Sequence, residues 1–223
     1  MKPALFKDRV DAGRQLAQAL EQYADRDDVI VLGLPRGGVP VAFEIAAHLH
    51  APMDVLVVRK LGVPGWPELA MGAIASGDIH VFNDEVVQQL EISKEEIAAV
   101  IAKESDELHR RETTYRGRTG APPVENKIVI LVDDGIATGS TMTAAVEAMR
   151  QLAPKMIVIA APVASPSSCE RLEARVDHVV VLEQPSHFRA VGEYYEHFAQ
   201  TSDDEVTSLL TQARPFQCPS VLA

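Results

Sequence analysis

The chain has 223 residues, of which 47% are hydrophobic and 24% are charged, and its formal net charge is −11. This is the composition of an ordinary globular protein that is long enough to bury a sizeable core. The acidic charge argues against a general nucleic-acid-binding surface and against a surface for anionic membranes. An anionic ligand would therefore need a local group of cationic side chains or backbone N–H groups.

Cysteine usage and hydropathy predict a cytoplasmic protein without a membrane segment. The two cysteines, Cys169 and Cys218, form neither a metal-binding spacing nor a disulfide framework, which suits a reducing compartment. The first ten residues contain no apolar signal core. The longest apolar run, Met156–Ala164, is too short to span a bilayer.

The elements predicted along the chain are typical of an α/β protein. A helical pattern at Asp8–Tyr23 comes first, and five apolar runs then predict strands. The runs are Val29–Leu34, Asp54–Arg59, Lys127–Asp133, Lys155–Val163 and Asp177–Glu183. Each run is apolar throughout, so both faces should be buried, and helical patterns at Val39–His48, Thr141–Leu152 and Ser167–Glu173 separate most of them. This alternation predicts a doubly wound, mainly parallel five-stranded sheet flanked by helices.

The region between the second and third predicted strands is longer than one crossover needs. A turn-rich stretch, Leu61–Glu68, precedes a predicted hairpin of Leu69–Ile74 and His80–Phe82. A long polar helix follows, with the capping-box pair Ser93 and Glu96 at its start. The helix pattern ends near residue 114, and residues 114–126 are predicted to form a loop.

We interpret residues 1–223 as one domain with a core at about 27–183 and an inserted hairpin and long helix at about 61–120. The remaining parts, residues 184–212 and the N-terminal helix at 8–24, would form a small variable hood.

The segment Ile128–Arg150 carries the strongest chemical signal. A predicted buried strand ends in Asp133 and Asp134, and the small-residue loop Gly135–Thr141 leads into a helix. Such a loop lets backbone N–H groups approach a phosphate, and the helix N-terminus adds partial positive charge. The paired carboxylates suit hydroxyl groups or a divalent cation, so the whole arrangement matches a ribose phosphate. Neither a Walker loop nor a G-x-G-x-x-G pattern is present here.

Two other predicted strands end in basic or glycine-rich residues. Arg36, Gly37 and Gly38 follow the first strand, where they could also form an ordinary turn, and Arg59 and Lys60 end the second. The carboxyl ends of parallel strands meet at one edge of a sheet, so we expect these groups to converge on the loop after the third strand.

The segment that contains Asp133 and Asp134 resembles the motif with which type I phosphoribosyltransferases bind phosphoribosyl pyrophosphate (PRPP). It has four apolar residues, two acidic residues and a small loop that ends in T-G-S-T. The resemblance implies that Asp133 and Asp134 hold the ribose hydroxyls, with Mg²⁺ bound near them through PRPP. It implies that the 5′-phosphate is held by Gly135, Ile136, Ala137, Thr138, Gly139, Ser140 and Thr141. Arg36, Gly37, Gly38, Arg59 and Lys60 would bind pyrophosphate.

The resemblance implies a Mg²⁺-dependent enzyme that transfers ribose 5-phosphate from PRPP to a nitrogen acceptor and releases pyrophosphate. We expect the acceptor to be a nucleobase. The alternative is a PRPP-sensing regulatory protein that does no transfer. The acidic composition, without a helix-turn-helix extension, favours the enzyme. We expect PRPP and a small-molecule acceptor as partners, a homodimer, and neither nucleic acid nor membrane.

The acceptor site is where the sequence says least. Within the family that this chain resembles, enzymes for 6-oxopurines carry an Asp at the position of Ala137. Ala at this position matches the adenine-type members of the family. Glu68 is the local candidate for a general base, and Lys60 is the second candidate catalytic residue. The aromatic residues of Ser186–Phe198 could stack on a base or pack in the core. The basic segment His109–Arg118 could compensate charge at a helix C-terminus or form an arm over pyrophosphate, and Leu61–Glu68 or the long helix could act as a lid.

Overall fold

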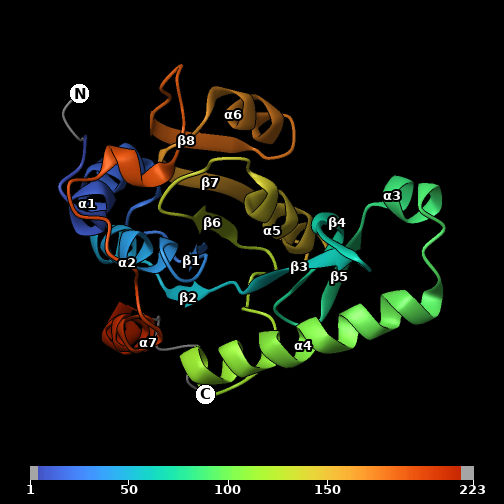
Figure 1. The fold of residues 1–223 in the computed structure, drawn as a ribbon. Helices are drawn as coiled ribbons and strands as arrows, with labels where there is room; N and C mark the ends of the chain where they lie inside the picture. Colours follow the sequence, from blue (N-terminus) through green and yellow to red (C-terminus); the bar gives the residue numbers. More distant parts are fainter. Residues whose placement is uncertain (1–4, 217–223) are drawn as a thin grey trace.

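A five-stranded parallel sheet forms the centre of the structure, a computed structural model that describes residues 5–216 (Figure 1). The strand order is β2–β1–β6–β7–β8, and every neighbouring pair is parallel. The strands are β1 (Val29–Gly33), β2 (Met53–Val55), β6 (Ile128–Val132), β7 (Met156–Val163) and β8 (His178–Glu183). This sheet and the helices around it confirm the predicted doubly wound α/β fold.

Helices cover both faces of this sheet, which explains why its strands are apolar throughout. In β1, Val29 and Val31 belong to one buried cluster, and Ile30 and Leu32 belong to another. This alternation follows from the two-residue period of a strand. The first cluster includes residues of α1 (Arg9–Ala19), α2 (Gly38–Leu49) and α7 (Asp203–Gln212). The second includes residues of α5 (Ser140–Arg150) and α6 (Pro166–Glu173).

The predicted second strand is wrong in its length, because the chain leaves the central sheet early. Strand β2 ends at Val55, and Val58 already begins β3 (Val58–Val63) of a separate sheet. Ser76 fixes the departure: its hydroxyl accepts a hydrogen bond from the Val57 N–H at 3.1 Å, and its own N–H donates to the Val57 carbonyl at 2.9 Å. Arg59 and Lys60 therefore lie inside β3 and not at the end of a central strand.

The separate sheet has three antiparallel strands in the order β3–β4–β5. Strands β4 (Trp66–Ala75) and β5 (Ile79–Phe82) form the predicted hairpin, with Gly77 and Asp78 in its turn. The turn-rich stretch Leu61–Glu68 contains a turn at Pro64–Gly65, but β3 and β4 extend through the rest of it as strands. Gly65 makes this tight turn possible, since its φ is +75°.

Two helices continue from the small sheet. Sequence patterns missed α3 (Asp84–Gln89), which begins with the Asn83 side chain accepting from the Val86 N–H. The long helix α4 (Lys94–Arg116) has the predicted capping box of Ser93 and Glu96. Its buried residues lie in its C-terminal half, and its N-terminal half extends away from the central sheet toward α3 (Figure 1).

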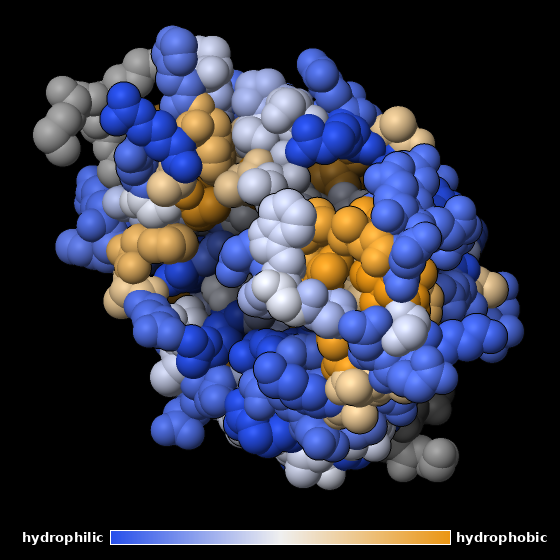
Figure 2. Space-filling model, turned by 45° about the vertical axis from the view of Figure 1, so that its right-hand side comes forward, coloured by the Kyte–Doolittle hydropathy of each residue, from blue (hydrophilic) through white to orange (hydrophobic). Residues whose placement is uncertain are grey.

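Hydrophobic surface gathers around the small sheet and α3, on the side that Figure 2 brings forward. Trp66 has 59% of its surface exposed and Leu90 has 44%. A hollow of about 380 Å³ lies between the β3–β4 turn and the start of α4, where Val63 and Ile92 line it with these two residues.

Cys169 is buried in the second cluster, and Cys218 lies outside the described residues. Of the helices within residues 5–216, none is both long enough and apolar enough to cross a membrane.

Candidate functional site

The loop after β6 has the form that a phosphate site needs. The Ile136 N–H donates to the Val163 carbonyl at 2.9 Å, which ties the loop to the neighbouring strand β7. Gly139 has φ +74° and caps α5, which begins at Ser140. The residues that face solvent here are Ala137, Thr138, Ser140 and Thr141. Exposed hydroxyl groups therefore surround the N-terminus of an 11-residue helix, where an anion is favoured.

This loop is held from behind by the start of α6. The hydroxyls of Ser165 and Ser168 both donate to the Ala137 carbonyl, each at 2.7 Å. The Arg171 guanidinium donates to the Thr138 carbonyl at 2.8 Å. With these carbonyl oxygens bound on the α6 side, the loop conformation is fixed before any ligand arrives, which lowers the free energy needed to organise the site. Sequence analysis did not find these three supporting residues.

Asp133 and Asp134 follow directly on β6, and both carboxyl groups are largely withdrawn from water. Burial and the neighbouring Asp134 carboxylate raise the pKa of Asp133 well above its ordinary value. Burial also raises the pKa of Asp134, and the Arg9 guanidinium opposes that shift. Two acidic groups held in this way need a partner that donates hydrogen bonds or carries positive charge.

Arg9 provides part of that compensation. Its Nε and Nη2 atoms lie 2.8 and 2.7 Å from Asp134 Oδ2. The Tyr195 hydroxyl donates to the backbone carbonyl of Asp134 at 2.6 Å. Sequence analysis missed Arg9, because an arginine in the first turn of a helix carries no local sign of a partner 125 residues away.

The loop after β1 lies directly against this pair of carboxylates. A Cβ atom added to Gly37 would be 2.0 Å from Asp134 Oδ2, and one added to Gly38 would be 2.5 Å from the Val132 carbonyl oxygen. The glycines are thus required by close approach, and the Pro35–Arg36 peptide bond beside them is cis. The structure therefore brings together Arg36–Gly38 and Asp133–Thr141 at one edge of the central sheet, as the sequence predicts.

The Arg36 guanidinium already has an acidic partner within the chain. Its Nη1 atom lies 3.7 Å from Asp203 Oδ1 at the start of α7, and 36% of its side chain is exposed. Asp203 also accepts a hydrogen bond from the Tyr115 hydroxyl at 2.7 Å. Burial first, and then this bond to Asp203, raise the pKa of Tyr115 to about 12, so the hydroxyl remains a donor at neutral pH.

The replacement of Gly37 by Ala tests whether this close approach matters for a ligand. The added methyl group would overlap Asp134 Oδ2 and displace the carboxylate. We expect the affinity for PRPP to fall by roughly tenfold or more, which corresponds to ~1.4 kcal/mol. Calorimetric titration measures this loss, and Gly65→Asn is the control because a Cβ at Gly65 meets nothing within 4 Å. Equal PRPP affinity for Gly37→Ala and the native chain would contradict the expected crowding.

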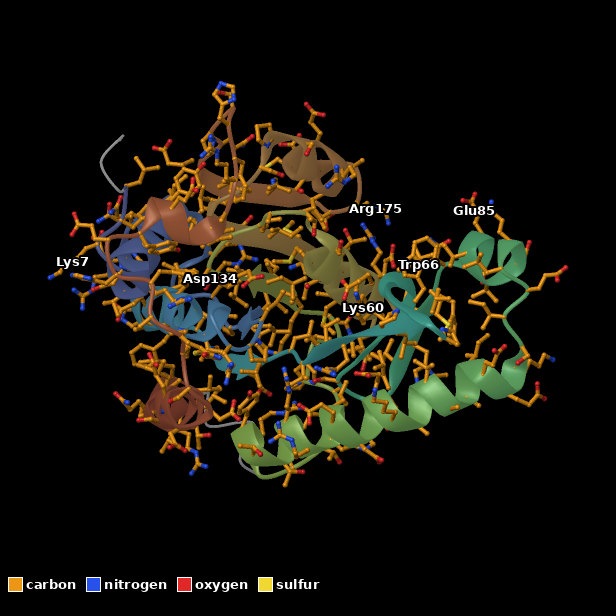
Figure 3. All side chains as sticks on the ribbon, viewed as in Figure 1. Lys7, Lys60, Trp66, Glu85, Asp134 and Arg175 are labelled. Carbon is orange, nitrogen blue, oxygen red and sulfur yellow. The ribbon has the colours of Figure 1, made fainter. Side chains whose placement is uncertain are left out.

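Arg59 and Lys60 lie on β3 of the small sheet and not at the end of a central strand, as was expected. Their side chains have different partners. Arg59 turns to α4, where its Nε donates to Glu104 at 2.9 Å. Lys60 Nζ lies 3.3 Å from the Glu68 carbonyl oxygen and 3.8 Å from Glu68 Oε2. Figure 3 shows Asp134 at the edge of the central sheet beside α1 and α2, and Lys60 on the small sheet. The Glu68 side chain is 90% exposed, so its carboxylate is solvated in this conformation.

The first described residues pack against residues 191–195, in the part of the chain expected to form the hood. The N–H groups of Leu5 and Phe6 donate to the Tyr194 carbonyl, and the Phe6 ring packs 5.5 Å from the Tyr195 ring. Tyr195 is only 5% exposed, which is core packing and not a free stacking surface. Burial raises the pKa of its hydroxyl far above the ordinary value. Val191, in the 3₁₀-helix η2 (Val191–Tyr194), covers Gly135 so closely that a Cβ there would meet it at 2.4 Å.

The basic segment His109–Arg118 is largely paired on its own helix. Arg110 and Arg111 both donate to Glu107, and these bonds lower the pKa of Glu107 to about 2. Arg116 is bound to Glu112 and lies near Asp54. These contacts favour local charge compensation over an arm that closes on pyrophosphate.

A divalent cation would need oxygen ligands from the substrate as well as from the chain. Within residues 5–216, no three His, Cys, Asp or Glu side chains are placed to hold a metal together. Asp133 and Asp134 are a pair of oxygen donors beside a phosphate-type loop. Mg²⁺ is typically bound by one or two carboxylates plus substrate phosphates, so this donor set fits a cation that arrives with PRPP.

Comparison with known proteins agrees with the geometry of the site. The family model described as "Phosphoribosyl transferase domain" matches residues 80–197, which include Asp133–Thr141 and more than half of the chain. The crystal structure of TT1426 from Thermus thermophilus superposes with a TM-score of 0.83 at 40% identity, covering 93% of this chain and 98% of that one. The Bifunctional protein PyrR of Clostridium acetobutylicum is 29% identical over 64% of this chain and 61% of its own length.

A longer relative comes from Mycobacterium tuberculosis. The protein named "Putative phosphoribosyl transferase Rv0571c" is 49% identical over 94% of this chain, and the matched part is 47% of its length. The chain thus spans about half the length of this curated relative. The match of the family model over the strand, the two carboxylates and the phosphate-type loop shows that the chain belongs to the phosphoribosyltransferase family.

Proposed function

We propose that this chain binds PRPP at the carboxyl edge of the central sheet and transfers its phosphoribosyl group to a nitrogen acceptor. The observation that carries this proposal is the direct packing of the Arg36–Gly38 loop against Asp134, beside the phosphate-type loop. One edge thus offers hydroxyl and helix N-terminal donors, two carboxylates and one partly exposed guanidinium. PRPP presents a phosphate, a diol and a pyrophosphate in a corresponding order.

Each part of the site has a distinct task in this proposal. The loop at Thr138–Thr141 binds the 5′-phosphate, and Asp133 and Asp134 accept hydrogen bonds from the ribose hydroxyls. Arg36 binds pyrophosphate, which would compete with Asp203 for its guanidinium. A rigid ribose is the main requirement of the reaction, because a well-held substrate removes much of its entropic barrier.

The proposed step breaks the bond between the anomeric carbon and the pyrophosphate oxygen, and a bond from the acceptor nitrogen to that carbon forms. The bonding electrons leave with pyrophosphate, and the acceptor nitrogen loses its proton to solvent or to a base. Positive charge that develops on the ribose is stabilised by the Asp133 and Asp134 carboxylates, and charge on the leaving group by Arg36. Mg²⁺, when bound with PRPP, would neutralise part of the pyrophosphate charge.

The acceptor is expected to be a base that needs no proton acceptor at the position of Ala137. The Ala137 side chain is exposed on the loop and has no group that can accept a proton. We therefore expect adenine-like bases or other amines to be better acceptors than hypoxanthine and guanine. Steady-state kinetics across a panel of bases measure this, with Ala137→Asp and Glu68→Gln as paired variants. A general base contributes roughly 10²–10⁴-fold in rate.

Efficient turnover of guanine by the native chain would contradict this expectation. A fall in the turnover rate of roughly 10²–10⁴-fold in Glu68→Gln would then identify Glu68 as the general base. Such a result would also require the small sheet to bring Glu68 toward the ribose, because its carboxylate is solvated here.

Release of pyrophosphate tests the proposed function as a whole. The native chain is incubated with PRPP, Mg²⁺ and each of a panel of bases and amines, and pyrophosphate is measured. Acceptor-dependent release supports an enzyme. PRPP binding without release for any acceptor supports the alternative, a PRPP-sensing regulator, and failure to bind PRPP contradicts both.

A further inference from the structure

Arg9, the first residue of α1, links the segment at Phe198 and Ala199 to the ribose end of the proposed site. Two of its N–H groups, on Nε and Nη2, converge on Asp134 Oδ2. Its Nη1 donates to the backbone carbonyl of Ala199 at 2.6 Å. The guanidinium carbon also lies 4.0 Å from the centre of the Phe198 ring, which is a cation–π distance. Arg9 is therefore fixed by contacts to three separate groups.

This ion pair is sheltered from water, which separates it from an ordinary surface pair. The side chains of Arg9 and Asp134 are only 12% and 14% exposed. By contrast, Arg14 on the same helix pairs with Glu44 while 70% of its side chain is exposed. A guanidinium fork usually binds both oxygens of a carboxylate, but here it binds Oδ2. Both donor atoms of the fork thus converge on one oxygen of the carboxylate.

The groups around Asp134 explain why a cation is needed here. Asp133 precedes it and is itself acidic, and Tyr195 contributes a neutral hydroxyl to its backbone carbonyl. Gly37, from the loop before α2, brings no charge. Among these neighbours, Arg9 is the cation whose donor atoms contact the carboxylate.

We propose that Arg9 is a positioning residue that holds the Asp134 carboxylate in place, so that Asp134 can accept a hydrogen bond from a ribose hydroxyl of PRPP. This inference rests on the proposed function. Arg9 acts through Asp134 and does not itself contact the ligand. Because its other contacts are to Phe198 and Ala199, it also couples the order of the C-terminal part of the hood to ribose binding.

Three variants test the proposal. Arg9→Met removes the charge but keeps a long side chain against Phe198, and Arg9→Lys keeps the charge but lacks the fork. Arg14→Met is the matched control on the same helix. Dissociation constants for PRPP with Mg²⁺, ribose 5-phosphate and pyrophosphate are measured by calorimetry, and thermal unfolding is followed in parallel.

Without the guanidinium fork, the Asp134 carboxylate loses the contacts that hold it in place. We expect Arg9→Met to weaken the binding of PRPP and ribose 5-phosphate by about 10- to 100-fold, as for the loss of one charge-assisted interaction. Pyrophosphate affinity should change little. Arg9→Lys should have intermediate affinity for PRPP and ribose 5-phosphate, and Arg14→Met should match the native chain.

Native affinity of Arg9→Met for both PRPP and ribose 5-phosphate would overturn the proposal. Equal weakening of all three ligands together with a lowered unfolding temperature would also overturn it, because that pattern indicates a structural role. If Arg9→Met does not fold, Arg9→Lys decides the question. Native affinity of Arg9→Lys for ribose 5-phosphate overturns the claim that the guanidinium fork positions Asp134, and a tenfold loss of that affinity supports it. Absence of PRPP binding by the native chain contradicts the proposed function instead.

Discussion

Replacement of both Asp133 and Asp134 by Asn is expected to lower the affinity for PRPP by at least two orders of magnitude. Each carboxylate is proposed to accept a hydrogen bond from a ribose hydroxyl, and a bond to a charged group contributes ~1.5–3 kcal/mol. Two such losses correspond to a factor of roughly 10² to 10⁴. Calorimetric titration of PRPP with Mg²⁺ measures the change.

The single variant Asp133→Asn should lose affinity for PRPP without losing thermal stability. Its folded-state pKa lies well above the unfolded value, so the folded chain binds more protons between those two pKa values. The free energy of unfolding therefore decreases as pH rises through this window, and the buried charge is destabilising at higher pH. Asp133→Asn removes that charge, and we expect an unfolding temperature at pH 8 equal to or above the native one.

A control must carry the same change in net charge away from the site. Asp84→Asn with Asp106→Asn alters two exposed carboxylates and should leave PRPP affinity unchanged. Comparable loss of affinity in this control would show that the effect is a general one of charge. Unchanged affinity in the Asp133 and Asp134 double variant would contradict the assignment of the ribose site.

The second large effect concerns stability and the buried pair of Glu112 and Arg116. Glu112 has no exposed surface, and its carboxylate accepts from Arg116 Nη2 at 2.6 Å and from the Gly120 N–H at 3.3 Å. Arg116 is 4% exposed and also donates to the Gly120 carbonyl at 2.6 Å. The pair thus fastens the end of α4 to the loop that leads back to β6. Burial raises the pKa of Asp54 nearby despite Arg116, so Asp54 is a weak replacement for Glu112.

Glu112→Met should lower the free energy of unfolding by about 3–5 kcal/mol, because Arg116 would remain as a buried charge without its main partner. Glu107→Met is the matched control, since Glu107 pairs with Arg111 at the same spacing on the same helix but has 30% of its side chain exposed. That change should cost less than about 1 kcal/mol. Urea unfolding measures both values. Equal losses in the two variants would contradict the special role of the buried pair.

Local sequence patterns predicted the central sheet well because both faces of its strands are buried. The run at Ile128–Val132 is fully buried in the structure, and the two carboxylates and small loop after it are one contiguous segment. When all residues of a motif follow one strand directly, their relative positions are set by the local chain and can be predicted from the sequence. Arg36–Gly38 was also placed correctly, since parallel strand ends meet at one edge.

Contacts between distant segments could not be predicted in the same way. Arg59 resembled a free basic residue at a strand end, but its partner Glu104 lies 45 residues away on α4. Arg9 lies 125 residues from Asp134, and Ser76 redirects the chain at Val57 from 19 residues away. In each case a pairing set by the tertiary fold decided the environment of the residue, and neither periodicity nor composition carries that information.

A crystal structure of the chain with PRPP and Mg²⁺ tests the central claim most directly. The account predicts the 5′-phosphate within hydrogen-bond distance of Thr138–Thr141, the ribose hydroxyls on Asp133 and Asp134, and pyrophosphate beside Arg36. Arg36 should then lie closer to pyrophosphate than to Asp203. PRPP bound elsewhere on the chain, or bound at this edge without contact to either carboxylate, would contradict it.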